Sequence, residues 1–191
     1  MDNQNLRMRL MLEAEKEIVE GLTEAERYRY FLGRMLFLRY ESGKENLITS
    51  DCSGSVCLAL LLATGCAIRV TADALFKKYF TKKNPDKDDI QAAFFMTLYD
   101  RKLGSRLYKE NEICHVAGLC GRDVVLNCVE PYSELRSLSD MKPWYNANDY
   151  RIIVRGLDRE ALQKASDDNV DLFGADYQFE QIRNAIDGAR G

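Results

Sequence analysis

Residues 51–65 read DCSGSVCLALLLATG, and this stretch begins the longest apolar run of the chain, which extends from Val56 to Ile68. The run is too short to span a bilayer, which takes about 20 residues, so it predicts a buried helix. Asp51 is a favourable N-cap, and Gly65 is a favourable residue to end the helix. We therefore expect a buried helix between these two residues.

Cys52 would lie in the first turn of this helix, where its thiol has a special electrostatic environment. Backbone N–H groups and the helix dipole favour negative charge at a helix N-terminus. A free thiol has a pKa of about 8.5, and this location is among those that lower it. Gly54 would allow another segment to approach closely. Two interpretations stay open, an activated nucleophile and a buried cysteine that starts a helix.

His115 is the single histidine of the chain, and its role depends on a neighbouring hairpin. Residues 113–129 predict two strands joined by a three-residue turn at residues 120–122. This register places His115 directly opposite Asn127, with Cβ atoms about 5 Å apart. A two-residue turn would instead place His115 opposite Cys128, so the pairing depends on the turn.

A helix-terminal thiol, a strand histidine and an asparagine that orients it form the constellation of cysteine proteases. In such a site His115 would take the proton of Cys52, and the thiolate would attack a carbonyl carbon. The protonated histidine would then donate a proton to the leaving amine. The backbone N–H of Cys52 would help to bind the oxyanion. These residues predict acyl-transfer chemistry.

Helical and strand-like patterns occupy different halves of the chain. Apolar spacing and caps predict helices over residues 6–18, 23–36, 50–64 and 71–80. Thr23 and Glu26 form a capping box at the start of the second helix. Strand-like segments follow at residues 92–99, 113–119, 123–129 and 150–155. Helices first and antiparallel strands afterwards predict an α+β fold.

The composition is that of an ordinary globular domain. The chain has 191 residues, of which 46% are hydrophobic and 30% charged, enough for one domain with a good core. The net charge is −3 with scattered Lys and Arg, which predicts neither a nucleic-acid partner nor a membrane partner. Six cysteines without a CxxC pair and a single histidine do not predict a zinc site. Five of the cysteines are expected to be small buried side chains.

Two motifs resemble those of the NlpC/P60 family of cysteine peptidases. DCSG at residues 51–54, followed by an apolar helix, is similar to the nucleophile motif of the family. HVAGLCGRDVVLN at residues 115–127 is similar to its second motif, with the same spacing to the third polar residue. Tyr40 stands where the family often has a tyrosine, and residues 68–73 (IRVTAD) resemble its PRTSADQ stretch. The resemblance covers about residues 36–155.

The resemblance implies a papain-like α+β fold, with helices packed on a central antiparallel sheet. Residues 36–156 would form the catalytic core, residues 1–35 a helical extension packed on it, and residues 157–191 a polar, partly helical tail. The implied catalytic roles are Cys52 as nucleophile, His115 as base and Asn127 as the orienting third member. No cofactor is implied.

The resemblance also implies a substrate site at Tyr40, Asp51 and Ser53. In relatives that cleave the γ-D-glutamyl–diaminopimelate bond of murein peptides, residues at these positions bind the free amine of an N-terminal L-alanine. A carboxylate, a hydroxyl and a phenol can satisfy an ammonium group. Helix capping explains Asp51 and Ser53 equally well, so both interpretations stay open.

Three hypotheses about function follow. The first is an endopeptidase that hydrolyses short peptidoglycan-type peptides. The N-terminus, MDNQNLRMRLMLEAEKE, does not resemble a signal peptide, so we expect action in the cytoplasm or delivery with a phage particle or another secretion device. The second hypothesis is an amidase or acyltransferase that uses the same triad on another acyl substrate. The third is a non-catalytic assembly protein, for example of a phage particle, on a peptidase-like fold.

Overall fold

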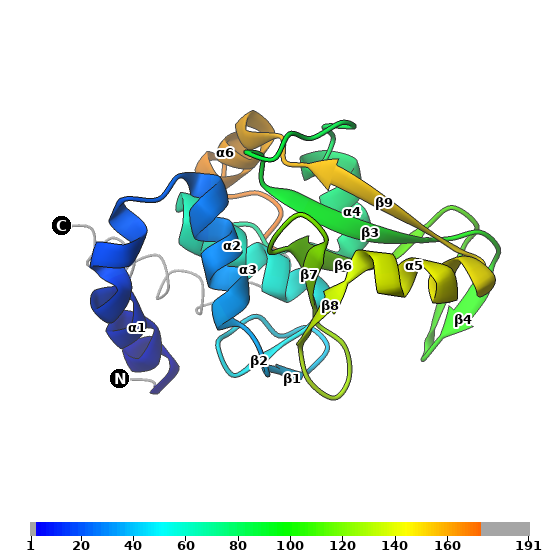
Figure 1. Ribbon diagram of the computed structural model, residues 1–191, viewed down its shortest axis with the longest axis horizontal. Helices are drawn as coiled ribbons and strands as arrows, with labels where there is room; N and C mark the ends of the chain where they lie inside the picture. Colours follow the sequence, from blue (N-terminus) through cyan, green and yellow to red (C-terminus); the bar gives the residue numbers. More distant parts are fainter. Residues whose placement is uncertain (1–2, 173–191) are drawn as a thin grey trace.

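The computed structural model describes residues 3–172 of the chain, which are arranged around one antiparallel sheet (Figure 1). The helical elements are α1 (Asn3–Glu20), α2 (Glu24–Arg34), α3 (Cys52–Thr64), α4 (Ala72–Ala74), the π-helical turn η1 (Leu75–Tyr79), α5 (Leu138–Ala147) and α6 (Arg159–Asp167). The strands are β1 (Arg39–Tyr40), β2 (Thr49–Ser50), β3 (Gln91–Thr97), β4 (Arg101–Leu103), β5 (Arg106–Tyr108), β6 (Ile113–Leu119), β7 (Val124–Asn127), β8 (Glu134–Ser137) and β9 (Tyr150–Gly156). Residues 173–191 of the expected tail lie outside the described residues.

The sequence signals at the ends of the helices act as predicted. Thr23 and Glu26 form the capping box of α2, in which Thr23 N donates to Glu26 Oε2 at 2.8 Å and Glu26 N donates to Thr23 Oγ1 at 3.3 Å. Asp51 caps α3 by accepting a first-turn backbone N–H at 2.6 Å. Gly65 ends α3 with a φ of 79°, which glycine adopts without strain. These signals make Cys52 the first residue of α3.

The main sheet has five strands in the order β8-β7-β6-β3-β9, and each neighbouring pair is antiparallel. The four predicted strand-like segments correspond to β3, β6, β7 and β9. The predictions missed β8, α5 and the separate hairpin formed by β4 and β5. The predicted α+β layout is confirmed.

The β6–β7 hairpin has a different register from the predicted one. Leu119 pairs with Val125 instead of Asp123, so the predicted three-residue turn is wrong by two residues. Side chains alternate between the two faces of a strand, so a shift of two residues leaves each side chain on the same face. His115 and Asn127 therefore share a face and meet as diagonal neighbours. A shift of one residue would have separated them.

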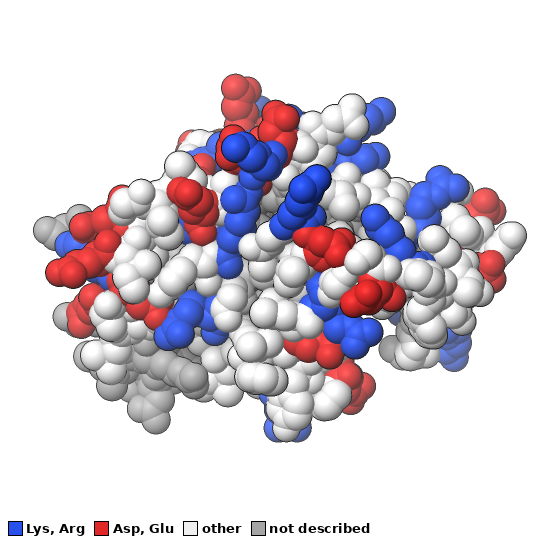
Figure 2. All heavy atoms as spheres, in the orientation of Figure 1, with Lys and Arg blue, Asp and Glu red and all other residues white. Residues whose placement is uncertain are grey.

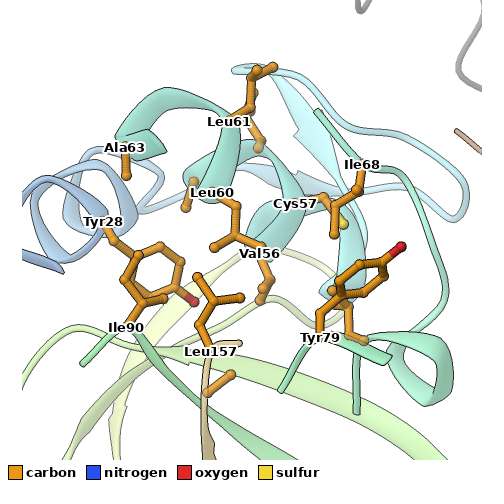
Figure 3. Packing of buried hydrophobic residues seen from close by; sticks show 14 of the residues in the cluster. Tyr28, Val56, Cys57, Leu60, Leu61, Ala63, Ile68, Tyr79, Ile90 and Leu157 are labelled. Carbon is orange, nitrogen blue, oxygen red and sulfur yellow. The ribbon is translucent and has the colours of Figure 1, made fainter. Parts of the chain in front are cut away.

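Different helices cover the two faces of the sheet. Side chains alternate along β3, so Phe94 belongs to the cluster with α2 and α3, whereas Phe95 belongs to the cluster with α5. Figure 3 shows the first cluster, in which Tyr28 of α2 lies near Leu60 of α3. Phe31 on α2 is 1% exposed. As predicted, α2 packs against α3, which fixes the helix that begins at the cysteine.

On the face that Figure 2 shows, the charged side chains are not gathered by sign. Figure 2 shows basic and acidic groups interspersed over the viewed face, in keeping with the net charge of −3. Within residues 3–172, we find no helix with the length and apolar character that a bilayer crossing requires. Nor do those residues include a group of three or more His, Cys, Asp or Glu side chains arranged to hold a metal ion.

All six cysteines are free thiols, but they are less uniformly buried than predicted. Cys57, Cys66 and Cys128 are buried. Cys114 and Cys120 are partly exposed, because they lie near the two ends of β6 rather than in its centre. The expectation that five cysteines are buried core residues is therefore correct for three of them.

Candidate active site

A cleft of about 320 Å³ opens where the N-terminus of α3 meets β6. Its walls come from the segment around β1, the first turn of α3, residues 69–73, β5 and the start of β6. Five of the six predicted site residues line it, namely Tyr40, Asp51, Cys52, Ser53 and His115. The sixth, Asn127, is 4% exposed and contacts His115 from β7. The fold therefore brings all six predicted residues into one region.

Cys52 is partly exposed, and its thiol is held in the protonated form by its surroundings. Burial raises the pKa of the thiol to about 12, and the adjacent Asp51 carboxylate acts in the same direction. The backbone N–H groups of Val116 and Ser53 lower the pKa, but they are outweighed. The predicted lowering of this pKa is therefore wrong, because desolvation exceeds the effect of the helix-terminal N–H groups. Formation of a thiolate requires a base.

His115 is held on two sides by neighbouring strands. Its Nε2 lies 2.8 Å from Oδ1 of Asn127. An amide oxygen only accepts hydrogen bonds, so Nε2 carries the proton and Nδ1 is the basic nitrogen. Phe95, which pairs with His115 across β3 and β6, lies against the imidazole with ring centroids 5.0 Å apart.

The surroundings of His115 keep the imidazole neutral. Burial lowers its pKa below the ordinary value of 6.5, although the bond to Asn127 and the charge of Asp51 act in the opposite direction. A neutral imidazole at pH 7 is the form that accepts a proton. The pair in the resting cleft is therefore a protonated thiol and a neutral base.

Asp51 is 8% exposed, and both of its carboxylate oxygens accept hydrogen bonds from the protein. Oδ1 accepts from Gly54 N at 2.6 Å and from Ser53 Oγ at 3.0 Å. Oδ2 accepts from Gly43 N and from Arg69 Nη2, each at 2.7 Å. These four bonds account for the acceptor capacity of a carboxylate. The geometry fits the capping role, and a substrate ammonium would have to compete with existing donors.

Arg69, which was not among the predicted site residues, connects both sequence neighbours of the nucleophile. Its Nη1 donates to Ser53 Oγ at 3.0 Å, and its Nη2 donates to Asp51 Oδ2. On the other side its Nε lies 3.0 Å from Glu45 Oε2, an ion-pair contact without hydrogen-bond geometry. Burial raises the pKa of Glu45 well above its ordinary value, against the lowering effect of Arg69. A sequence signal existed, since Arg69 lies in the segment 68–73 that resembles a family motif.

Two tyrosines, Tyr40 and Tyr108, line the cleft near the thiol. Burial raises the pKa of Tyr40 to about 12 and raises that of Tyr108 as well, and a negative charge on Cys52 would act in the same direction on both. Tyr108 and Arg106 belong to β5, in the hairpin that was not predicted. Its sequence signal was the two-residue turn that begins at Gly104, whose φ is 59°.

Comparisons with known proteins support the fold. No protein-family model matches the chain, and no curated protein matches it. The structure is similar to that of NlpC1 from Trichomonas vaginalis, with a TM-score of 0.51 and 16% sequence identity, covering 71% of this chain and 44% of that protein. NlpC2 from the same organism has a TM-score of 0.49 and 17% identity, with coverage of 71% and 46%. An NLP/P60 family protein similar to lipoprotein, from Staphylococcus aureus, has a TM-score of 0.48 and 13% identity, with coverage of 70% and 41%.

The chain spans less than half the length of each of these proteins. At these identities the likeness concerns the fold. The predicted α+β fold of the NlpC/P60 type is confirmed, and the roles of individual residues stay predictions.

Proposed function

We propose that the chain is a cysteine peptidase in which Cys52 is the nucleophile and His115 the base. Asn127 would be the positioning residue. The observation that supports this proposal best is the arrangement of one cleft, with Cys52 at the first residue of α3 and His115 on β6. The bond from His115 to Asn127 leaves Nδ1 as the nitrogen that accepts a proton.

The first step would be attack of Cys52 Sγ on a carbonyl carbon. The thiol proton passes to Nδ1 of His115 as the S–C bond forms, because a thiol with a pKa of about 12 does not ionise by itself near neutral pH. The carbonyl π electrons move to oxygen and give a tetrahedral oxyanion. As the first residue of α3, Cys52 has a backbone N–H without an intrahelical acceptor, which can bind that oxyanion.

The second step would break the bond to the leaving group. The oxyanion collapses to a thioester, and imidazolium at His115 donates its proton to the departing nitrogen. His115 then removes a proton from water, which attacks the thioester and releases the acid and the free thiol. The bond from Asn127 would keep the imidazole in the same orientation through both proton transfers.

We propose a short peptidoglycan-type peptide as the substrate, with cleavage at the γ-D-glutamyl–diaminopimelate bond. The fold similarity and the presence of Tyr40, Asp51 and Ser53 in the cleft support this choice.

One observation favours a second candidate. Because Asp51 already accepts four hydrogen bonds, an amidase or acyltransferase acting on a substrate without a free amine would need no rearrangement of the cleft.

The test is hydrolysis of L-Ala-γ-D-Glu-diaminopimelate and of its N-acetylated form by the wild type and by Cys52→Ala. Cys120→Ala is the matched control, because this thiol lies beyond the far end of β6 from the cleft. Cleavage that requires a free N-terminus and Cys52 would support the peptidase and the amine site. Cleavage of both peptides would support the chemistry without the amine site. Failure to cleave either peptide would contradict the peptidase proposal and favour another acyl substrate or a non-catalytic role.

A further inference from the structure

The β4–β5 hairpin forms one wall of the catalytic cleft. It is inserted between β3 and β6, does not pair with the main sheet, and projects from one end of the molecule (Figure 1). Arg106 and Tyr108 of β5 line the same cleft as Cys52 and His115. The hairpin thereby places a cation at the mouth of a site whose proposed reaction takes place on a carbonyl group.

The other charges of the cleft are already engaged. Arg69 is 7% exposed and is bound to Asp51 and Ser53. The carboxylate of Asp73 lies 2.7 Å from the ammonium of Lys77. Among the described residues of the cleft wall, these pairs leave Arg106 as the cation that is accessible to a solute.

Arg106 is supported from two sides but keeps hydrogen-bonding capacity. Its side chain is 49% exposed, and its guanidinium carbon lies 4.5 Å from the centre of the Tyr108 ring, a cation–π contact. Nη2 donates to Glu112, whose other oxygen accepts the backbone N–H of Lys109 at 2.9 Å. A guanidinium has five N–H donors, so one carboxylate contact leaves donors for a second anion.

We propose that Arg106 is a specificity-determining residue that selects acyl substrates with a carboxylate close to the reacting carbonyl. This inference rests on the proposed function of Cys52. Arg106 pairs with the substrate carboxylate through its free N–H groups, while the contact with Tyr108 holds the guanidinium at the cleft wall. The substrate is therefore an acidic peptide or amide, and the β4–β5 hairpin, through Arg106, is the element that recognises its negative charge.

The experiment compares two alkylating agents of similar size, one negatively charged and able to pair with Arg106, the other neutral. Iodoacetate carries a carboxylate on the carbon that the thiol attacks, whereas iodoacetamide is neutral. The modification rate of Cys52 is measured for each by mass spectrometry in the wild type, Arg106→Gln, Arg106→Lys and Lys102→Gln. Cys120 serves as the internal reference thiol, and Lys102 is an exposed cation on β4 of the same hairpin outside the cleft wall.

We expect the ratio of the iodoacetate rate to the iodoacetamide rate at Cys52 to fall roughly three- to tenfold in Arg106→Gln, as expected for one unit charge near a partly solvated site. Arg106→Lys should retain part of the ratio, and Lys102→Gln should retain all of it. An unchanged ratio in Arg106→Gln, with Cys52 still reactive, would overturn the role of Arg106 and leave the proposed function intact. A Cys52 rate that is unchanged in His115→Ala for both agents would overturn both, because the proposed function makes His115 the base for this thiol.

Discussion

Replacing Arg69 with Met would leave the buried carboxyl groups of Asp51 and Glu45 without the cation that lies between them. Arg69 Nη2 is 2.7 Å from Asp51 Oδ2, and Arg69 Nε is 3.0 Å from Glu45 Oε2. Removing one partner of a buried ion pair destabilises a protein by about 3–5 kcal/mol, because an uncompensated charge stays buried. The free energy of unfolding should fall by that amount at pH 7, a large part of the roughly 5–15 kcal/mol typical of a domain.

The pH dependence of this loss identifies its cause. The pKa of Glu45 is raised in the folded protein even with Arg69 present, and removal of the cation raises it further. A carboxyl group with a raised folded pKa binds its proton more tightly when folded, so it destabilises the fold increasingly as the pH rises above the unfolded pKa of about 4.3. The loss relative to the wild type grows only above the raised folded pKa that Glu45 has beside Arg69, so urea unfolding of Arg69→Met should show a smaller loss at pH 5 than at pH 9. Arg69→Met combined with Glu45→Gln should recover part of the loss at pH 9.

A loss below about 1 kcal/mol at pH 7, or one that is equal at both pH values, would refute this reasoning. The first result would mean that the contacts of Arg69 contribute little to stability. The second would mean that the loss comes from packing of the aliphatic part of the side chain rather than from the two carboxyl groups.

His115→Ala should change the pH profile of Cys52 alkylation. The wild-type rate should be nearly constant above pH 6.5 and should fall at lower pH as His115 becomes protonated. The variant rate should instead rise about tenfold per pH unit towards the thiol pKa of about 12. Matching profiles would contradict the role of His115 as base. Phe31→Ala should lower the free energy of unfolding by roughly 3–5 kcal/mol, because Phe31 of α2 is 1% exposed and belongs to the core cluster that also contains α3. Phe37→Ala, at a side chain that is 74% exposed, is the control for thermal melting, and an unchanged melting curve for Phe31→Ala would show that α2 does not stabilise the fold through this contact.

The fold could be predicted where local patterns and tertiary burial agree. The apolar α3 is bounded by an N-cap and a glycine, and β3 and β6 read as apolar segments of strand length. The missed α5 contains Pro143, which local rules place outside a helix interior. That helix forms because Leu138 and Met141 pack on the sheet, a gain that the local sequence does not reveal. The β4–β5 hairpin was missed because its exposed residues need no alternating pattern.

The candidate site was predictable in its residues but less so in its interactions. His115 and Asn127 were matched by a register that is wrong by two residues, and the prediction of their contact survived because strand side chains repeat every two residues. The hydrogen bond between Arg69 and Asp51 joins positions 18 residues apart, and no sequence periodicity predicts it. The segment 68–73 that resembles a family motif points to Arg69, but only the folded chain shows which side chains it contacts.

The sign of the pKa shift at Cys52 illustrates why local rules fail in the cleft. A helix N-terminus favours a thiolate, but burial disfavours every charged form, which raises the pKa of the thiol and lowers that of the imidazole. The same desolvation therefore disfavours both members of a resting thiolate–imidazolium pair, the thiolate of Cys52 and the imidazolium of His115. In the proposed mechanism charge would therefore develop together with bond formation, when an oxyanion is present for backbone N–H groups to bind. In the proposed mechanism such a cleft would keep Cys52 weakly nucleophilic until an acyl substrate occupies it, and His115, rather than the helix dipole, would be the main determinant of reactivity.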